Sequence, residues 1–212
     1  MSFFKKMFGS EQKQRAVTQV KDLQINDIVV FTDSFALPSL LRDQQFQVSA
    51  VNCYEYEHRT QTEWVLIGQS DVELFLSLEV DDKTYLKLSL KVEHHDVETL
   101  FNLDAFSEVF DEPGQAFLTR QSDNDHTQGW SGEEYKQQAF AQVGFFHRKD
   151  NRVTQLSQFE GSEAGEQFEL YTLYDQDETR GIDIEVWEDG DTDVFLTLFR
   201  PTTDIVDMYP GS

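Results

Sequence analysis

The densest group of potential metal ligands in this chain is the sequence His94-His95-Asp96. Imidazole and carboxylate groups can hold zinc or iron when a third ligand converges on them. A structural role explains the same motif, because an aspartate placed just before apolar residues is typical of a helix N-cap. His94 and His95 are therefore the metal-ligand candidates of this sequence, and we expect no resident cofactor.

A second acidic pattern lies near the C-terminus, where Asp189, Asp191 and Asp193 alternate as in the first positions of a calcium-binding loop. The pattern then fails, because glycine stands at position 190 and the twelfth position is Arg200 rather than glutamate. The spacing favours a solvated hairpin loop.

Sequence motifs of nucleophilic catalysis are missing. Cys53 falls within a predicted strand and has no catalytic motif around it, which favours a packing role. Glu134-Tyr135-Lys136 has the Glu-x-Lys spacing of some nucleases, but it falls in a segment predicted to be helical. We therefore expect no catalytic residues. Two alternatives stay open: a metal-dependent or carboxylate-based hydrolase, and a small-ligand-binding protein whose groove is lined by aromatic side chains such as Trp64, Trp130 and Trp187.

The 212 residues include 40 acidic and 17 basic side chains, which gives a formal net charge of -23. This charge repels nucleic acid and attracts basic surfaces, so the predicted partner is another protein and nucleic acid is excluded. The single cysteine, Cys53, rules out an internal disulfide, and the sequence contains neither a secretory apolar segment nor an apolar run that could span a bilayer. These features predict a cytoplasmic protein.

Residues 1–21 differ electrically from the rest, with a net charge of +4 against -27 for the remainder. A helix at the start of this segment would bring apolar side chains together beside two lysines, as in segments that dock on a partner protein or on a membrane surface. A tail without function is the alternative, because so short a helix is marginal in water. The residues predicted to make the contact are Phe3, Phe4, Met7 and Phe8.

Short runs rich in Val, Leu, Phe and Tyr predict two sets of four strands. Around Asp81-Asp82-Lys83, apolar and polar residues alternate on both sides, which predicts a hairpin with one face in water. The first set comprises residues 46–56, 63–67, 74–80 and 84–92, and the second set comprises residues 153–159, 168–174, 182–187 and 194–199.

The two sets match in order. Leu-Ser-Leu-Glu-Val at 76–80 corresponds to Ile-Asp-Ile-Glu-Val at 182–186, and a helical turn is predicted to close each set, at Asp96 and at Asp204. The predicted fold class is α+β with mostly antiparallel β structure, as two tandem β-meander units with short closing helices that arose by internal duplication. Alternating hairpins also resemble one another by composition alone, which is the competing explanation.

This organisation divides the chain into the basic segment 1–21, a first β-rich unit 22–110, a connecting segment 111–150 and a second β-rich unit 151–212; one continuous domain is the alternative. Additional helices are predicted at 39–43, at 104–110, and after Ser131, whose spacing to Glu134 is that of a capping box.

Four stretches resemble, in length and layout, the YjfK-like family of uncharacterised bacterial proteins, which are grouped as a domain of unknown function. They are the N-terminal Met-Ser-Phe-Phe-Lys-Lys-Met-Phe-Gly, the strand at 27–30, the Trp-Val-Leu strand at 64–66 and the Leu-Ser-Leu-Glu-Val of 76–80. The resemblance implies a setting near homologues of phage-shock protein A, which coat and protect the inner membrane, and it supplies no catalytic residues. It makes a non-enzymatic cytoplasmic accessory protein of an envelope-stress system, peripheral to the inner membrane, the leading expectation.

Overall fold

The computed structural model describes residues 15–69, 72–152 and 165–211. Antiparallel strands dominate and the α-helices are short, so the predicted α+β, mostly β class is confirmed. The strands are β1 (Ile28–Phe31), β2 (Gln45–Glu55), β3 (Thr60–Ile67), β4 (Glu73–Val80), β5 (Thr84–Val92), β6 (Phe117–Thr119), β7 (Glu134–His147), β8 (Glu166–Tyr174), β9 (Arg180–Trp187), β10 (Thr192–Pro201) and β11 (Ile205–Tyr209). The helices are α1 (His94–Leu100) and α2 (Leu103–Ser107), with short 3-10 helices η1 (Val20–Asp22), η2 (Glu108–Phe110) and η3 (Thr202–Asp204).

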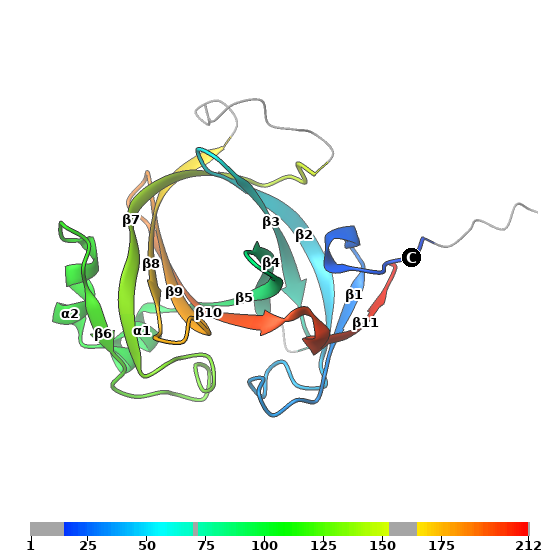
Figure 1. Cartoon of the computed structure of the whole chain (residues 1–212), viewed down its shortest axis with the longest axis horizontal. Coiled ribbons are helices and arrows are strands. Elements are labelled where there is room, and N and C mark those ends of the chain that lie inside the picture. Colours follow the sequence, from blue (N-terminus) through cyan, green and yellow to red (C-terminus); the bar gives the residue numbers. More distant parts are fainter. Residues whose placement is uncertain (1–14, 70–71, 153–164, 212) are drawn as a thin grey trace, which may run out of the picture.

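All these strands belong to one sheet that closes on itself (Figure 1). Eight of them form the ring, in the order β2-β3-β4-β5-β10-β9-β8-β7, and the ring closes where Cys53–Glu55 of β2 pair with Phe145–His147 of β7. The pair β11-β1 extends the sheet beyond β2, and β6 extends it beyond β7. The closure brings together side chains from strands that are far apart in the sequence.

The two faces of this ring differ in chemistry. On β9, Ile182 and Ile184 point outward into the apolar core, while Asp183 and Glu185 between them point into the ring. The same alternation holds on β5, where Leu86 and Leu88 flank Lys87. The period of two along a strand therefore separates an apolar outer face from a polar inner face.

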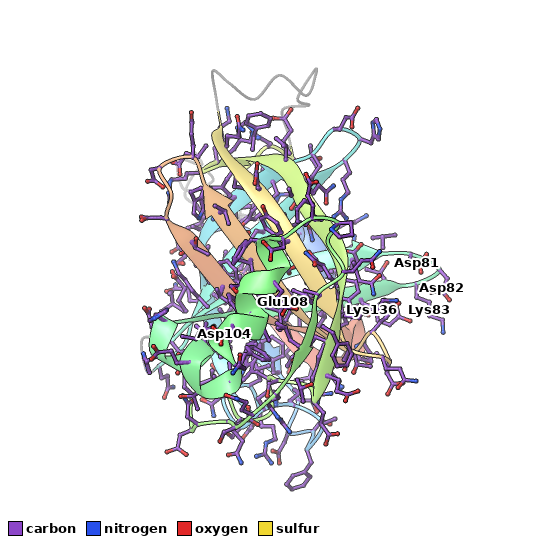
Figure 2. The ribbon with its side chains drawn as sticks, turned by 90° about the vertical axis from the view of Figure 1, so that its left-hand side faces the viewer. Asp81, Asp82, Lys83, Asp104, Glu108 and Lys136 are labelled. Carbon is purple, nitrogen blue, oxygen red and sulfur yellow. The ribbon has the colours of Figure 1, made fainter. Side chains whose placement is uncertain are left out.

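The outer face is covered by the segments between the strands. In Figure 2 the helices lie in front of the ring, with Asp104 and Glu108 labelled on them. Phe110 packs edge-to-face on Tyr171 of β8, with ring centroids 5.2 Å apart. On the side of η1, Trp64 Nε1 donates to the carbonyl of Leu23 at 3.1 Å. This cover buries apolar strand faces that would otherwise contact water.

The hairpin β4–β5 forms as predicted, with Asp81, Asp82 and Lys83 projecting from its tip (Figure 2). The prediction that one of its faces lies in water is wrong. Ser77 and Ser89 on that face are only 8% and 7% exposed. The reason is ring closure, which encloses the polar face of the hairpin.

The helix predicted after Ser131 is also wrong, because residues 134–147 form β7. Ser131 Oγ bonds to the carboxylate of Asp123 and to Arg120 instead of capping a helix. β7 pairs along much of its length with β8, and the resulting backbone hydrogen bonds outweigh local helix propensity.

The closing helix predicted at Asp204 is reduced to the single turn η3 and is followed by β11. Ile205–Tyr209 pair with the free edge of β1, which supplies hydrogen bonds that a short isolated helix lacks. Residues 39–43, predicted as a helix, form turns.

The first closing helix, α1, is present, and α2 with η2 confirms the helix predicted at 104–110. The N-cap of α1 is Glu93 rather than Asp96. Asp96 takes the N3 position of a capping box, where its carboxylate accepts a hydrogen bond from the Glu93 backbone N–H at 3.0 Å. The strand predicted at 153–159 lies outside the described residues.

A glycine in β7 is required by the packing inside the ring. Gly144 is the register partner of Phe168, and a Cβ at position 144 would overlap the Phe168 ring, which is 1% exposed. We expect Gly144→Ala to lower the free energy of unfolding by about 1–3 kcal/mol, measured by urea denaturation. Gly132→Ala is the control, because a Cβ there meets its neighbours at an ordinary 3.4 Å. Equal stability of the two variants would contradict this packing constraint.

Candidate functional site

The inner face of the ring carries a group of buried ionisable side chains that come from strands on opposite sides of the ring. They surround a small inner cavity of about 30 Å³, enough for one or two water molecules. Its lining is drawn from seven of the eight ring strands and consists of Tyr54, Tyr56, Gln61, Glu63, Ser77, Lys87, Ser89, Leu170, Asp183, Glu185 and Phe195.

One half of this polar interior is a satisfied ion pair. Lys87 Nζ lies 2.8 Å from Asp183 Oδ2, and the two Asp183 oxygens also accept from Thr172 and Thr197 at 2.8 and 3.2 Å. Burial lowers the pKa of Lys87, but the Asp183 charge more than reverses this, so the net pKa is raised and Lys87 stays protonated. This half of the interior holds the strands together.

The other half contains two carboxyl groups without a cation of their own. Burial raises the pKa of Glu63 to about 7, against a hydrogen bond donated by Asn52 Nδ2 to Glu63 Oε1 at 3.1 Å. Burial and the charge of Glu63 together raise the pKa of Glu185 to about 8, against a hydrogen bond with Tyr54. These two side chains are 5% and 6% exposed.

Two polar atoms in this half have no hydrogen-bond partner among the described residues. They are Glu185 Oε2, an acceptor, and Gln61 Nε2, a donor. A buried polar atom without a partner is destabilising and is usually satisfied by water or by a ligand. We therefore expect these two atoms to bind a water molecule or a ligand inside the ring.

Beside the inner cavity the ring opens into a second cavity of about 570 Å³, which we call the mouth. We call the part of its lining that contains Glu63 and Glu185 the floor of the mouth. Tyr54, Glu63, Glu185 and Phe195 line both the mouth and the inner cavity. Four aromatic rings form its walls in two edge-to-face pairs: Phe75 with Phe195 at 5.4 Å between centroids, and Phe146 with Trp187 at 5.8 Å.

The charged side chains that line the mouth comprise five carboxylates and three cations. Lys91 Nζ is held by Asp193 at 2.6 Å, and Arg148 makes two hydrogen bonds to Glu166 at 3.1 and 3.0 Å. Two of the three cations are thus neutralised at the rim, whereas the two carboxyl groups on the floor are not. The set comprises Glu63, Glu73, Asp150, Glu185, Asp193, Lys91, Arg148 and Lys149.

A larger hollow of about 790 Å³ adjoins the mouth on the outside of the rim and includes Asp189, Asp191 and Asp193. Asp189 Oδ1 accepts from the Asp191 backbone N–H at 3.1 Å, as expected for a hairpin loop, and Asp193 is engaged by Lys91. None of the buried unpaired atoms lies here, so the mouth is the stronger candidate for a site.

The predicted metal ligands lie elsewhere, on the first turn of α1. Their side chains are 81% and 74% exposed for His94 and His95, and they contact Glu98 and Asp96 respectively at 3.3 Å. Asp96 also meets His126 at 3.2 Å and accepts from Asn124 at 2.7 Å, so it ties α1 to a loop. In the described ranges, no three His, Cys, Asp or Glu side chains form a group that could hold a metal ion.

Cys53 and His147 are register partners on β2 and β7, on the strand faces opposite to Tyr54 and Phe146. His147 Nε2 lies 2.8 Å from Glu55 Oε2 in a buried pair. Burial raises the pKa of the Cys53 thiol, which keeps it protonated and unreactive. The packing role predicted for Cys53 fits this environment.

Of the three tryptophans, Trp187 lines the mouth, while Trp64 and Trp130 are buried in the outer core. The predicted contact residues Phe3, Phe4, Met7 and Phe8 lie outside the described residues, so docking through them stays a prediction. In the part of the chain that the structure describes, none of the helices has the length and apolar content needed to cross a bilayer.

The fold and site define an α+β protein whose closed antiparallel sheet encloses a polar, acidic interior that opens at the mouth. The chain matches no model of a known protein family, no curated protein and no solved structure. The resemblance to YjfK-like proteins, and the envelope-stress role that it implies, stay predictions.

Proposed function

We propose that this protein binds a small polar molecule in the mouth of its closed sheet. The observation that carries the proposal is the unpaired Glu185 Oε2, which is buried and lines the mouth and the inner cavity. Pockets for small molecules combine apolar and aromatic walls with a few polar groups that fix the ligand, and cavities of about 300–1,000 Å³ are typical. The aromatic walls, the polar floor and the volume of the mouth fit this description.

A carboxylate-based hydrolase is less well supported by the same residues. General acid–base catalysis uses two groups whose environments drive their pKa values apart, so that one is ionised and the other protonated. Here burial raises the pKa of both Glu63 and Glu185, to about 7 and about 8. The two shifts share one direction and one main cause, so they assign neither group as the acid nor as the base.

Filling the mouth tests the binding role. Ala50 lines the mouth, and we expect Ala50→Trp to occupy the space that a ligand needs. A library of small anionic, neutral and cationic metabolites would be screened by thermal shift and by ligand-observed NMR. We expect at least one class to bind the wild type and to lose about 10-fold or more in affinity, about 1.4 kcal/mol, in Ala50→Trp.

The matched control is Ala36→Trp, which places the same side chain on an exposed turn. It should leave binding unchanged. Binding that is equal in wild type and Ala50→Trp, or that is missing from the wild type for the whole library, would overturn the proposed function.

We also infer that the two halves of the ring derive from an internal duplication. The meanders β2–β5 and β7–β10 follow the same strand order, and a helical turn follows each. The matching sequences at 76–80 and 182–186 fall on β4 and β9, the third strand of each meander. Each half then contributes one carboxyl group to the floor of the mouth: Glu63 from the first and Glu185 from the second.

A further inference from the structure

We propose that the ligand of the mouth is a small organic cation carrying an ammonium group, which pairs with Glu63 and Glu185. This inference rests on the proposed function, because it names the chemical class that the same cavity selects. It depends on three features of the mouth: the charge of its floor, the aromatic walls and the lack of a metal-binding group.

The floor selects for positive charge. Glu63 is close enough to Glu185 for its charge to raise the pKa of Glu185, and neither has a cationic partner within ion-pair distance in the described part of the chain. Lys87, the nearest buried cation, is already held by Asp183 at 2.8 Å. An anion entering the mouth would meet two carboxyl groups at low dielectric, whereas a cation would compensate them.

Hydrogen-bonding capacity points to the same class. Glu185 Oε2 is an unused acceptor, and the Tyr54 hydroxyl is a neighbour of both carboxyl groups. A primary ammonium group offers donors and no acceptor, which matches a floor of carboxylate oxygens, whereas a quaternary ammonium group offers the positive charge without donors. The unused donor of Gln61 faces the inner cavity, where a water molecule fits.

The walls favour an organic cation over a metal ion. Phe75, Phe146, Trp187 and Phe195 surround the approach to the floor, and aromatic faces attract ammonium groups and pack against their carbon substituents. Calcium or zinc would need more oxygen, nitrogen or sulfur ligands than two carboxyl groups supply. No such set of three exists in the part of the chain that the structure describes.

A charge-only comparison of ligands tests the inference on the wild-type protein. Choline and 3,3-dimethyl-1-butanol have nearly the same shape, but only choline is charged. Both would be titrated by isothermal calorimetry, with tetramethylammonium, putrescine and agmatine as further cations. We expect at least one cation to bind, with Trp187 fluorescence changing, and the neutral alcohol to bind at least about 10-fold more weakly than choline.

Variants assign the binding to the floor. At about pH 9, where both carboxyl groups of the floor are ionised, Glu63→Gln and Glu185→Gln keep the shape and remove the charge, and each should weaken cation binding by at least about 30-fold, as for the loss of one partner of a buried charge pair. Glu108→Gln, on the exposed helical segment labelled in Figure 2, removes a charge far from the mouth and should change nothing.

The outcomes separate the two proposals. Weakened cation binding in the two floor variants alone supports the inference. If neutral or anionic library members bind in the mouth and are lost in Ala50→Trp while no cation binds, the binding function stands and the cation class is overturned. Cation binding that survives both floor substitutions also overturns it, because the acidic surface would then be the binding site. Absence of binding by every compound overturns both proposals.

Discussion

Lys87→Met should lower the free energy of unfolding by about 3–5 kcal/mol, because it leaves the charge of Asp183 buried without its cation. Lys87 and Asp183 are only 17% and 7% exposed and lie 2.8 Å apart. The remaining partners of Asp183 are the neutral hydroxyls of Thr172 and Thr197, which cannot compensate a full charge. Urea denaturation at neutral pH measures the loss.

The double variant Lys87→Met with Asp183→Asn distinguishes a lost ion pair from a lost side chain. The amide retains hydrogen bonds to the two threonines and carries no charge, so the double variant should be more stable than Lys87→Met alone. Lys83→Met, at the exposed tip of the β4–β5 hairpin (Figure 2), is the matched control and should be nearly neutral. A double variant less stable than both single variants would show that the pair does not act as an isolated charge pair.

The second large effect is a free energy of unfolding that falls as pH rises from about 5 to about 8. Replacing Glu63 or Glu185 by glutamine should remove part of this fall. Burial raises the pKa of Glu63 and Glu185 from 4.5 to about 7 and about 8. Between the unfolded and folded values the folded protein binds more protons than the unfolded chain, so its stability decreases with increasing pH. Each group contributes up to about 1.4 kcal/mol per pH unit within that window.

We therefore expect Glu185→Gln to match the wild type at about pH 5 and to exceed it by about 3 kcal/mol at about pH 8, with Glu63→Gln showing a smaller gain. Urea denaturation across this range, at constant ionic strength, measures the difference. The other ionisable neighbours of these carboxyl groups are Tyr54, Glu73, Lys87 and Asp183. Glu108→Gln should follow the wild-type curve, and parallel curves for wild type and Glu185→Gln would contradict the proton linkage.

The local pattern of the sequence was enough to locate several elements. The alternation of residues 74–80 and 84–92 predicted the β4–β5 hairpin, and the matching pattern near the C-terminus predicted β9 and β10. The helix at α1 followed from apolar residues placed three and four apart. The predictions failed at Ser131 and Asp204, where strand pairing with β8 and β1 overrode local helix signals.

The candidate site could not be predicted in the same way. Glu63 and Glu185 are two among 40 acidic residues, and nothing in their immediate sequence distinguishes them from carboxylates in water. The one local signal is the period-2 pattern that places each of them on the polar face of its strand, and this pattern does not distinguish an enclosed polar face from one in water. His94 and His95, which the sequence singled out, lie exposed on α1, away from the mouth.

The sequence by itself determined the antiparallel, strand-rich class, the division of each strand into an apolar and a polar face, and the acidic character of the protein. Only the tertiary structure decided that the polar face is enclosed, that the strands form one ring and that two carboxyl groups meet on its floor. Side-chain alternation is a property of neighbouring residues, whereas closure depends on contacts such as His147 with Glu55 and Ser89 with Thr197, which are 92 and 108 residues apart. Residues so far apart in the sequence come into contact only when the whole chain packs. Burial of the apolar outer face of the ring drives that packing.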